Sequence, residues 1–203
     1  MNEKRSLLLR WSDFREPLTA SDVFARLPML ETPRLILRPM KMSDAQDIFA
    51  YSKDPEVARH VLWEAHRSIS DARLYLRYML RQYRNGLPSS YGIILKETGR
   101  LVGTIGFMWY NEEHASTEVG YSLARHLWNQ GLMTEALGAV LDMAFDLMHV
   151  NRVEAMHDAA NPASGRVMEK CGMRREGTLR QKVFNKGRYV DVALYAIVAK
   201  DRQ

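Results

Sequence analysis

The sequence predicts a mixed α/β domain of the α+β type, built around a largely antiparallel sheet. Three observations predict this fold class. The chain has 203 residues, of which 46% are hydrophobic, and this is enough for one sizeable core. Strand-like segments form two hairpins and three single strands, with helix-like segments between them. The chain contains no internal repeat and no low-complexity tract, which excludes a repeat architecture.

The first half of the domain begins with a strand. Apolar residues alternate over 32–40, which is typical of a strand. The segment that starts at Ser43 has an apolar side and predicts a helix. Two apolar runs within 91–110 flank a turn at 97–100 and predict a hairpin. Between these lies a helix over 70–83, with arginines on one face and its apolar side formed by Leu74, Tyr75, Tyr78, Met79 and Gln82.

The second half continues with a strand over 117–124 and a long helix over 132–148, which carries an apolar stripe at helical spacing. A strand over 151–158 leads to a short helix over 161–172. Asn161 is its expected N-cap, and Pro162 suits the first helical position. A closing hairpin, with its turn at 185–188, completes the chain.

Residues 1–29 differ from the rest and predict an N-terminal extension to a domain over 30–203. Trp11 and Phe14 stand among charges, and Ser21 or Asp22 is the expected cap of a short helix. Because exposed aromatic side chains need cover, we expect the extension to pack on the domain.

Charge and cysteine content narrow the function classes. The net charge is +5, but no dense lysine or arginine run is present, so neither a nucleic-acid partner nor a membrane partner is expected. Cys171 is the only cysteine, which excludes an intrachain disulfide, and the histidines lack zinc-ligand spacing, so no metal site is expected. The N-terminal apolar run is too short for a signal peptide, and we expect a cytoplasmic location.

Four stretches carry a family resemblance. They are TPRLILRPMKMSDAQDIF, EVGYSLARHLWNQGLMTEAL, NPASGRVMEKCGMRREG and FNKGRYVDVALYAI. In this order they resemble the GNAT superfamily of acetyl-CoA-dependent N-acetyltransferases, and within it the RimJ/RimL branch, which acetylates protein N-terminal amines. The resemblance implies a twisted, mostly antiparallel sheet of about seven strands, splayed between the fourth and fifth, with about four flanking helices. It also implies acetyl-CoA as cosubstrate and a possible homodimer.

The stretch HLWNQGLMTEAL resembles the loop that holds the pyrophosphate of coenzyme A. A helix start leaves backbone N–H groups unpaired and adds partial positive charge, which together attract an anion. Only Gly131 matches the family's glycine pattern outright, and an ordinary helix N-terminus is the alternative interpretation. The expected phosphate contacts are the backbone N–H groups of Asn129, Gln130, Gly131, Leu132, Met133 and Thr134.

The splayed strands of the family leave backbone groups free to pair with the pantetheine arm. The resemblance assigns this role to the fourth strand at Val119, Tyr121 and Leu123, with Asn161 facing the pantetheine from the other side. A plain N-cap is the alternative role for Asn161.

Amine acetylation needs a base for the ammonium and a proton donor for the departing thiolate. Glu118 resembles the family's strand glutamate that serves as base, whereas a solvent-facing or ion-paired glutamate is the alternative. Glu112, Glu113 or His114 acting through water is a further option. Met168 stands where many members have a tyrosine acid, and Ser164 matches a hydroxyl placed near the thioester sulfur. A backbone N–H at Val119 or Tyr121 is expected to polarise the carbonyl.

The sequence therefore predicts an N-acetyltransferase that acts on a protein or peptide N-terminal amine by direct attack in a ternary complex. Two alternatives stay open. One is a small-molecule amine such as a polyamine or an aminoglycoside, favoured by the acidic residues Glu112 and Glu113. The other is a non-catalytic acyl-CoA-binding regulatory module, favoured by the missing tyrosine.

Overall fold

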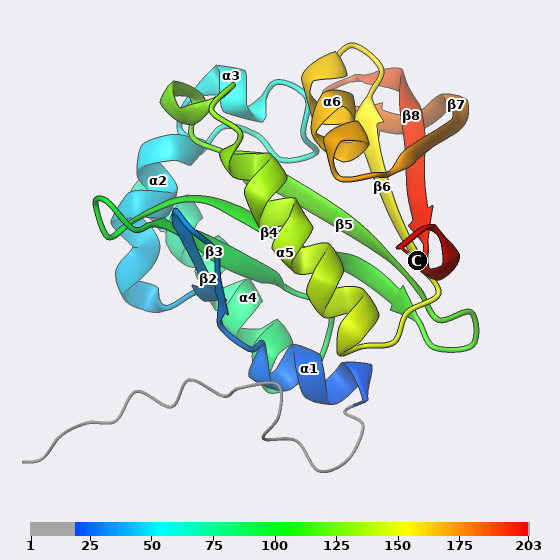
Figure 1. Cartoon of the computed structure of the whole chain (residues 1–203). Coiled ribbons are helices and arrows are strands. Elements are labelled where there is room, and N and C mark those ends of the chain that lie inside the picture. Colours follow the sequence, from blue (N-terminus) through cyan, green and yellow to red (C-terminus); the bar gives the residue numbers. More distant parts are fainter. Residues whose placement is uncertain (1–18, 203) are drawn as a thin grey trace, which may run out of the picture.

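The computed structural model describes residues 19–202, which form one sheet with helices on both of its faces (Figure 1). The sheet order is β1-β2-β3-β4-β5-β6-β8-β7, and every neighbouring pair is antiparallel except β5 and β6. The eight strands are β1 (Leu30–Glu31), β2 (Leu35–Pro39), β3 (Ser90–Leu95), β4 (Arg100–Asn111), β5 (Ser116–Leu123), β6 (Arg152–Asp158), β7 (Arg174–Asn185) and β8 (Arg188–Val198).

The described helices outnumber the four expected, because the chain adds α1 and the one-turn α3. In Figure 1, α5 crosses the front of the sheet and α4 lies behind it. Within the described part of the chain, no helix is both long and apolar enough to cross a membrane. The α-helices are α1 (Ala20–Arg26), α2 (Ala45–Ser52), α3 (Pro55–Ala58), α4 (Ile69–Arg84), α5 (Leu132–Asp146) and α6 (Pro162–Lys170).

Helix α1 packs into the same core as the rest of the domain. Phe24 is 2% exposed, and its ring centroid lies 5.5 Å from that of Phe107. The expected cap at Ser21 or Asp22 is wrong: Thr19 is the N-cap, and its side chain and that of Asp22 satisfy each other's backbone N–H. Trp11 and Phe14 lie outside the described residues, and the boundary at residue 30 stays a prediction.

Helix α4 buries only part of the predicted face: Met79 is buried and Tyr75 packs against the core, as expected. Leu74 and Tyr78 are 62% and 52% exposed, whereas the buried positions are Ala72, Leu76, Met79 and Tyr83. The small Ala72 lets the helix approach its neighbours closely. The Tyr83 hydroxyl donates to the Ser90 carbonyl at 2.5 Å and accepts the Met40 N–H at 3.1 Å. Large apolar residues alone therefore misidentify the inner face.

The sheet opens between β5 and β6. These strands pair only at three positions, the last of which joins Glu118 to Glu154, and β5 then continues to Leu123 paired with β4 alone. When the two-residue β1 is left out of the count, they are the fourth and fifth strands, so the predicted splay is confirmed. Beyond the opening, the Tyr121 hydroxyl donates to the Ser164 carbonyl at 3.0 Å and bridges β5 to α6.

Candidate active site

The free edge of β5 presents backbone groups to the opening. The Ala124 N–H bonds to the Val102 carbonyl of β4 at 2.8 Å. Because successive N–H groups of a strand point to opposite sides, those of Leu123, Tyr121 and Val119 point away from β4 and toward the opening. The predicted pantetheine-facing residues therefore have the required orientation. The Leu123 carbonyl already accepts the Trp128 indole N–H at 2.8 Å, which anchors the following loop to β5.

The loop before α5 forms a cradle of unpaired backbone N–H groups. Asn129 and Gly131 both have left-handed backbones, with φ of 60° and 77°, which turn this loop sharply. Gly131 is the N-cap and has no side chain to cover the helix start. Among residues 19–202, the N–H groups from Asn129 to Thr134 have no protein acceptor. Unpaired amides at the start of a fifteen-residue helix fit a pyrophosphate.

Arg34 supports this cradle from the β1–β2 edge, and the sequence predictions missed it. Its Nη1 donates to the Gln130 carbonyl at 2.9 Å, and its Nε bonds to a Glu135 carboxylate oxygen at 2.7 Å. Glu135 also accepts the Thr32 hydroxyl at 2.6 Å. The Arg34–Glu135 ion pair neutralises the negative charge of a carboxylate in the first turn of α5. It also places the half-exposed Arg34 guanidinium beside Gly131. Arg34 lies in the first of the four resembling stretches, but nothing in its sequence context links it to residue 131.

Asn161 and Ser164 face each other at the start of α6. The Asn161 side chain donates to the Ser164 hydroxyl at 3.1 Å and makes no capping bond to the helix backbone. Asn161 is therefore the N-cap residue of α6, as predicted, but its side chain is not used for capping. Pro162 takes the first helical position, as predicted, where its missing N–H costs nothing.

Glu118 lies at the last paired position before the opening. Its carboxylate accepts the Trp109 indole N–H at 2.7 Å. Burial raises the pKa of Glu118, the Trp109 hydrogen bond lowers it, and the nearby Glu154 raises it further, with a net upward shift. Glu154 is itself held by Arg152 at 2.7 Å, and Arg152 also pairs with Glu176. A half-buried carboxylate with a raised pKa is suited to accept a proton.

Glu118 and Ser164 approach the opening from opposite faces of the sheet. Side chains alternate along β5, and the Tyr121 side chain reaches α6, so Glu118, an odd number of positions away, faces the other side. The same face carries Met108, which occupies a bulge of β4 and passes over Gly120, where an added Cβ would lie 2.8 Å from the Met108 sulfur. The Glu118 carboxylate and Ser164 therefore lie on opposite faces of the sheet at the opening.

The other candidate groups have different positions. Cys171 contacts the Thr134 carbonyl at 3.3 Å, and burial raises the pKa of its thiol to about 11, so it is a poor nucleophile. Met168 is core, with 1% exposed. Glu112, Glu113 and His114 lie in the turn between β4 and β5, before the paired segment of β5.

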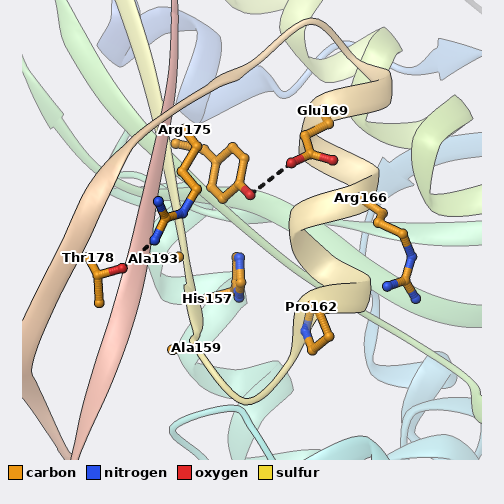
Figure 2. A pocket seen from close by; sticks show the side chains of 9 residues that line it. His157, Ala159, Pro162, Arg166, Glu169, Arg175, Thr178 and Ala193 are labelled. Carbon is orange, nitrogen blue, oxygen red and sulfur yellow. Dashed lines mark hydrogen bonds between the residues drawn. The ribbon is translucent and has the colours of Figure 1, made fainter.

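Two cavities lie outside this opening. One, of about 260 Å³, lies beside α6 and is lined by His157 and Glu169, among others (Figure 2). The Tyr195 hydroxyl, which also lines it, donates to the Glu169 carboxylate at 3.1 Å. His157 packs against Gly165, where a Cβ would come within 2.8 Å of its Nε2 atom. The second, of about 680 Å³, lies between α2 and the β3–β4 hairpin. Neither of these cavities includes Glu118.

Residues 34–174 match the acetyltransferase (GNAT) domain family, and the chain belongs to it. The uncharacterized N-acetyltransferase YoaA of Bacillus subtilis is 34% identical over 171 residues, covering 84% of this chain and 97% of the relative. The ribosomal protein uS5-alanine N-acetyltransferase of Escherichia coli is 25% identical, covering 85% and 91%. A GNAT-family acetyltransferase from Bacillus anthracis superposes with a TM-score of 0.76 at 27% identity, covering 86% and 99%.

The chain is thus an N-acetyltransferase of the GNAT family with RimJ/RimL-like relatives, and acetyl-CoA is its cosubstrate. The expected family and fold are confirmed. The roles of individual site residues stay predictions.

Proposed function

We propose that this enzyme acetylates the N-terminal amine of a protein or peptide, with Glu118 as the general base. The observation that carries the proposal is the position of Glu118. It is a half-buried carboxylate with a raised pKa, at the point where β5 leaves β6, and it lies on the face opposite the start of α6. An amine can therefore reach Glu118 from one face while the cosubstrate occupies the other.

Acetyl-CoA supplies the acetyl group as a thioester. The N–H groups from Asn129 to Thr134 hold its pyrophosphate, and those of Val119, Tyr121 and Leu123 face its pantetheine arm. Glu118 takes one proton from the ammonium, which frees the nitrogen lone pair for attack on the carbonyl carbon. A β5 backbone N–H at Val119 or Tyr121 polarises the carbonyl oxygen.

Ser164 passes its hydroxyl proton to the departing thiolate as the C–S bond breaks, and in return takes the second proton that the attacking nitrogen loses when the amide forms. Its hydroxyl accepts the Asn161 side-chain N–H at 3.1 Å, which orients the hydroxyl oxygen and leaves its hydrogen free to point into the opening. Asn161 is a positioning residue in this scheme. Because position 168 is a methionine, which has no proton to donate, the tyrosine acid used by many GNAT enzymes has no counterpart there.

A polypeptide acceptor agrees better with the charges at the site than a polyamine does. Arg152 pairs with both Glu154 and Glu176, which reduces the negative charge beside Glu118 that would attract a polycation. The bacterial relative that acetylates a ribosomal-protein alanine points in the same direction.

A panel of acceptors tests the proposal. Peptides with free N-termini, spermidine and an aminoglycoside are each incubated with acetyl-CoA, and free thiol is measured. We expect turnover on one or more peptides, with no turnover on the same peptides after N-acetylation. A preference for spermidine would move the acceptor to the small-amine class, and acetyl-CoA binding without any turnover would support the non-catalytic module.

Trp109→Phe is expected to shift the acid limb of the pH–rate profile to higher pH. The indole N–H stabilises ionised Glu118, so its loss raises the pKa of this carboxyl further. A general base works only when it is deprotonated, so activity falls as the pH drops through its pKa. Because this pKa is higher in the variant, the variant loses activity at a higher pH than the wild type does. The profile of kcat/KM checks this. Trp63→Phe, an aromatic change at a residue not bonded to Glu118, is the control, and a profile unchanged in Trp109→Phe would contradict the role of the indole.

A further inference from the structure

The outer face of α4 carries two adjacent rows of side chains. At about 100° per residue, the exposed residues of this helix occupy one arc of roughly 140°. Leu74 and Tyr78 form an apolar row along one side of the arc, 62% and 52% exposed. The other row consists of four exposed arginines, Arg73, Arg77, Arg81 and Arg84.

The four arginines have no carboxylate partner among residues 19–202. Some arginines elsewhere in this part of the chain are paired, such as Arg38 with Asp44 at 2.8 Å and Arg152 with Glu176 at 2.5 Å, but on α4 four exposed and unpaired arginines lie on one face. The long helix therefore concentrates unneutralised positive charge on one face of a protein whose net charge is +5. A face of this kind attracts an anionic partner.

We propose that this face, the α4 row pair, docks an acidic amphipathic helix of the acceptor protein. Arg73, Arg77 and Arg81 follow one another at about 6 Å along the axis, the spacing of carboxylates at every fourth position of a partner helix. A leucine row on that helix would cover Leu74 and Tyr78. This proposal rests on the proposed function. It adds which part of the acceptor protein, other than its N-terminus, the enzyme recognises.

The apolar row favours a helix over RNA. RNA binding gains from phosphate contacts and from aromatic stacking, and Leu74 contributes to neither. An aliphatic and an aromatic residue at positions i and i+4, beside charges of one sign, match a complementary amphipathic helix.

The α4 row pair is also connected to the active site. Helix α4 begins eight residues after Val61, whose carbonyl accepts the Lys186 ammonium of the β7–β8 turn at 2.6 Å. In the same loop, His60 bonds to Asp158 at the end of β6 at 2.9 Å. A partner held along α4 therefore lies next to the loop that borders the opening.

Binding is tested with the full chain and a peptide about three heptads long that presents a leucine row beside a glutamate row. The peptide is N-acetylated, so it cannot serve as an acceptor. Fluorescence anisotropy is expected to show that Arg77→Glu with Arg81→Glu weakens binding by about tenfold or more, since attraction becomes repulsion. Leu74→Ser with Tyr78→Ser is expected to weaken it similarly, which simple charge attraction would not do.

Lys170→Glu with Arg180→Glu is the matched control, because it changes the net charge equally at exposed sites on α6 and β7. Its affinity is expected to stay within about twofold of the wild type, since screened surface charges act over about 10 Å or less. Equal losses in this control and in the α4 variant would overturn the proposal. So would tight binding of an RNA oligonucleotide that Leu74→Ser with Tyr78→Ser leaves intact.

Kinetics separate this proposal from the proposed function. A short unstructured peptide acceptor is expected to keep its kcat/KM in the Arg77→Glu, Arg81→Glu variant, whereas the same N-terminus fused to the acidic helix loses affinity, seen as a higher KM. Peptide binding without any acetyl transfer would sink the proposed function and leave the docking surface standing. If the KM and kcat/KM for acetyl transfer were the same with and without the fused helix, the docking surface would be wrong and the proposed function would stand.

Discussion

Gly131→Val is expected to weaken acetyl-CoA binding by about 100-fold, as measured by calorimetry. Gly131 has φ of 77°, which a β-branched residue avoids, so the loop must rearrange. Loss of about two charge-assisted hydrogen bonds, each contributing about 1.5 kcal/mol, accounts for this factor. Inside the protein, an added Cβ would meet only Arg34, at 3.6 Å, so the expected loss of folding stability is limited to backbone strain.

Gly99→Val provides a matched control for that strain. Gly99 has φ of 67° in the turn between β3 and β4, and a Cβ there would meet no atom within 4 Å. Both variants are expected to lower the free energy of unfolding by about 1–2 kcal/mol, but only Gly131→Val loses acetyl-CoA affinity. If Gly131→Val lost stability while keeping its affinity, the loop would be an ordinary helix entry.

Glu118→Gln is expected to lower kcat by about 100-fold or more while leaving the acetyl-CoA dissociation constant unchanged, because general bases contribute about 10²- to 10⁴-fold. The amide oxygen still accepts the Trp109 N–H, so the local structure is kept. Steady-state kinetics at saturating acceptor measures the first quantity, and calorimetry measures the second.

Glu154→Gln is the companion variant. It removes the neighbouring negative charge that raises the pKa of Glu118, so the acid limb is expected to move to lower pH with kcat largely retained.

Ser164→Ala, in the same assay, is expected to lower kcat by about tenfold or more, as for loss of a proton donor. Full activity of Glu118→Gln would assign the base to another group, such as a water held by the β4–β5 turn.

The sequence predicted the segment from β5 to α6 best, because its strand, loop and helix signals lie within a short stretch of chain. Leu132 begins α5 and Pro162 begins α6, as the patterns indicate. Local patterns were sufficient here because helix starts depend on a few neighbouring residues.

The errors concern contacts between distant segments. The inner face of α4 depends on Ala72 and on a tyrosine hydroxyl bonded to β3, and a count of large apolar side chains detects neither. Arg34 reaches residue 130 across 96 positions of sequence, and no local pattern reports such a pairing. Trp109 reaches Glu118 only because a bulge in β4 shifts the strand register.

The cradle that we propose for the pyrophosphate is made of main-chain amides, and this affects how the protein can diverge. The side chains of Leu132 and Met133 are buried in the core, whereas their backbone N–H groups have no acceptor among the described residues. Packing therefore constrains the side chains, and ligand contact depends on the backbone. Substitutions that preserve the turn leave the amides in place. Most residues of this motif can therefore be substituted during evolution while the backbone N–H groups stay in position. A poor match to the family's glycine pattern is thus weak evidence that function has been lost.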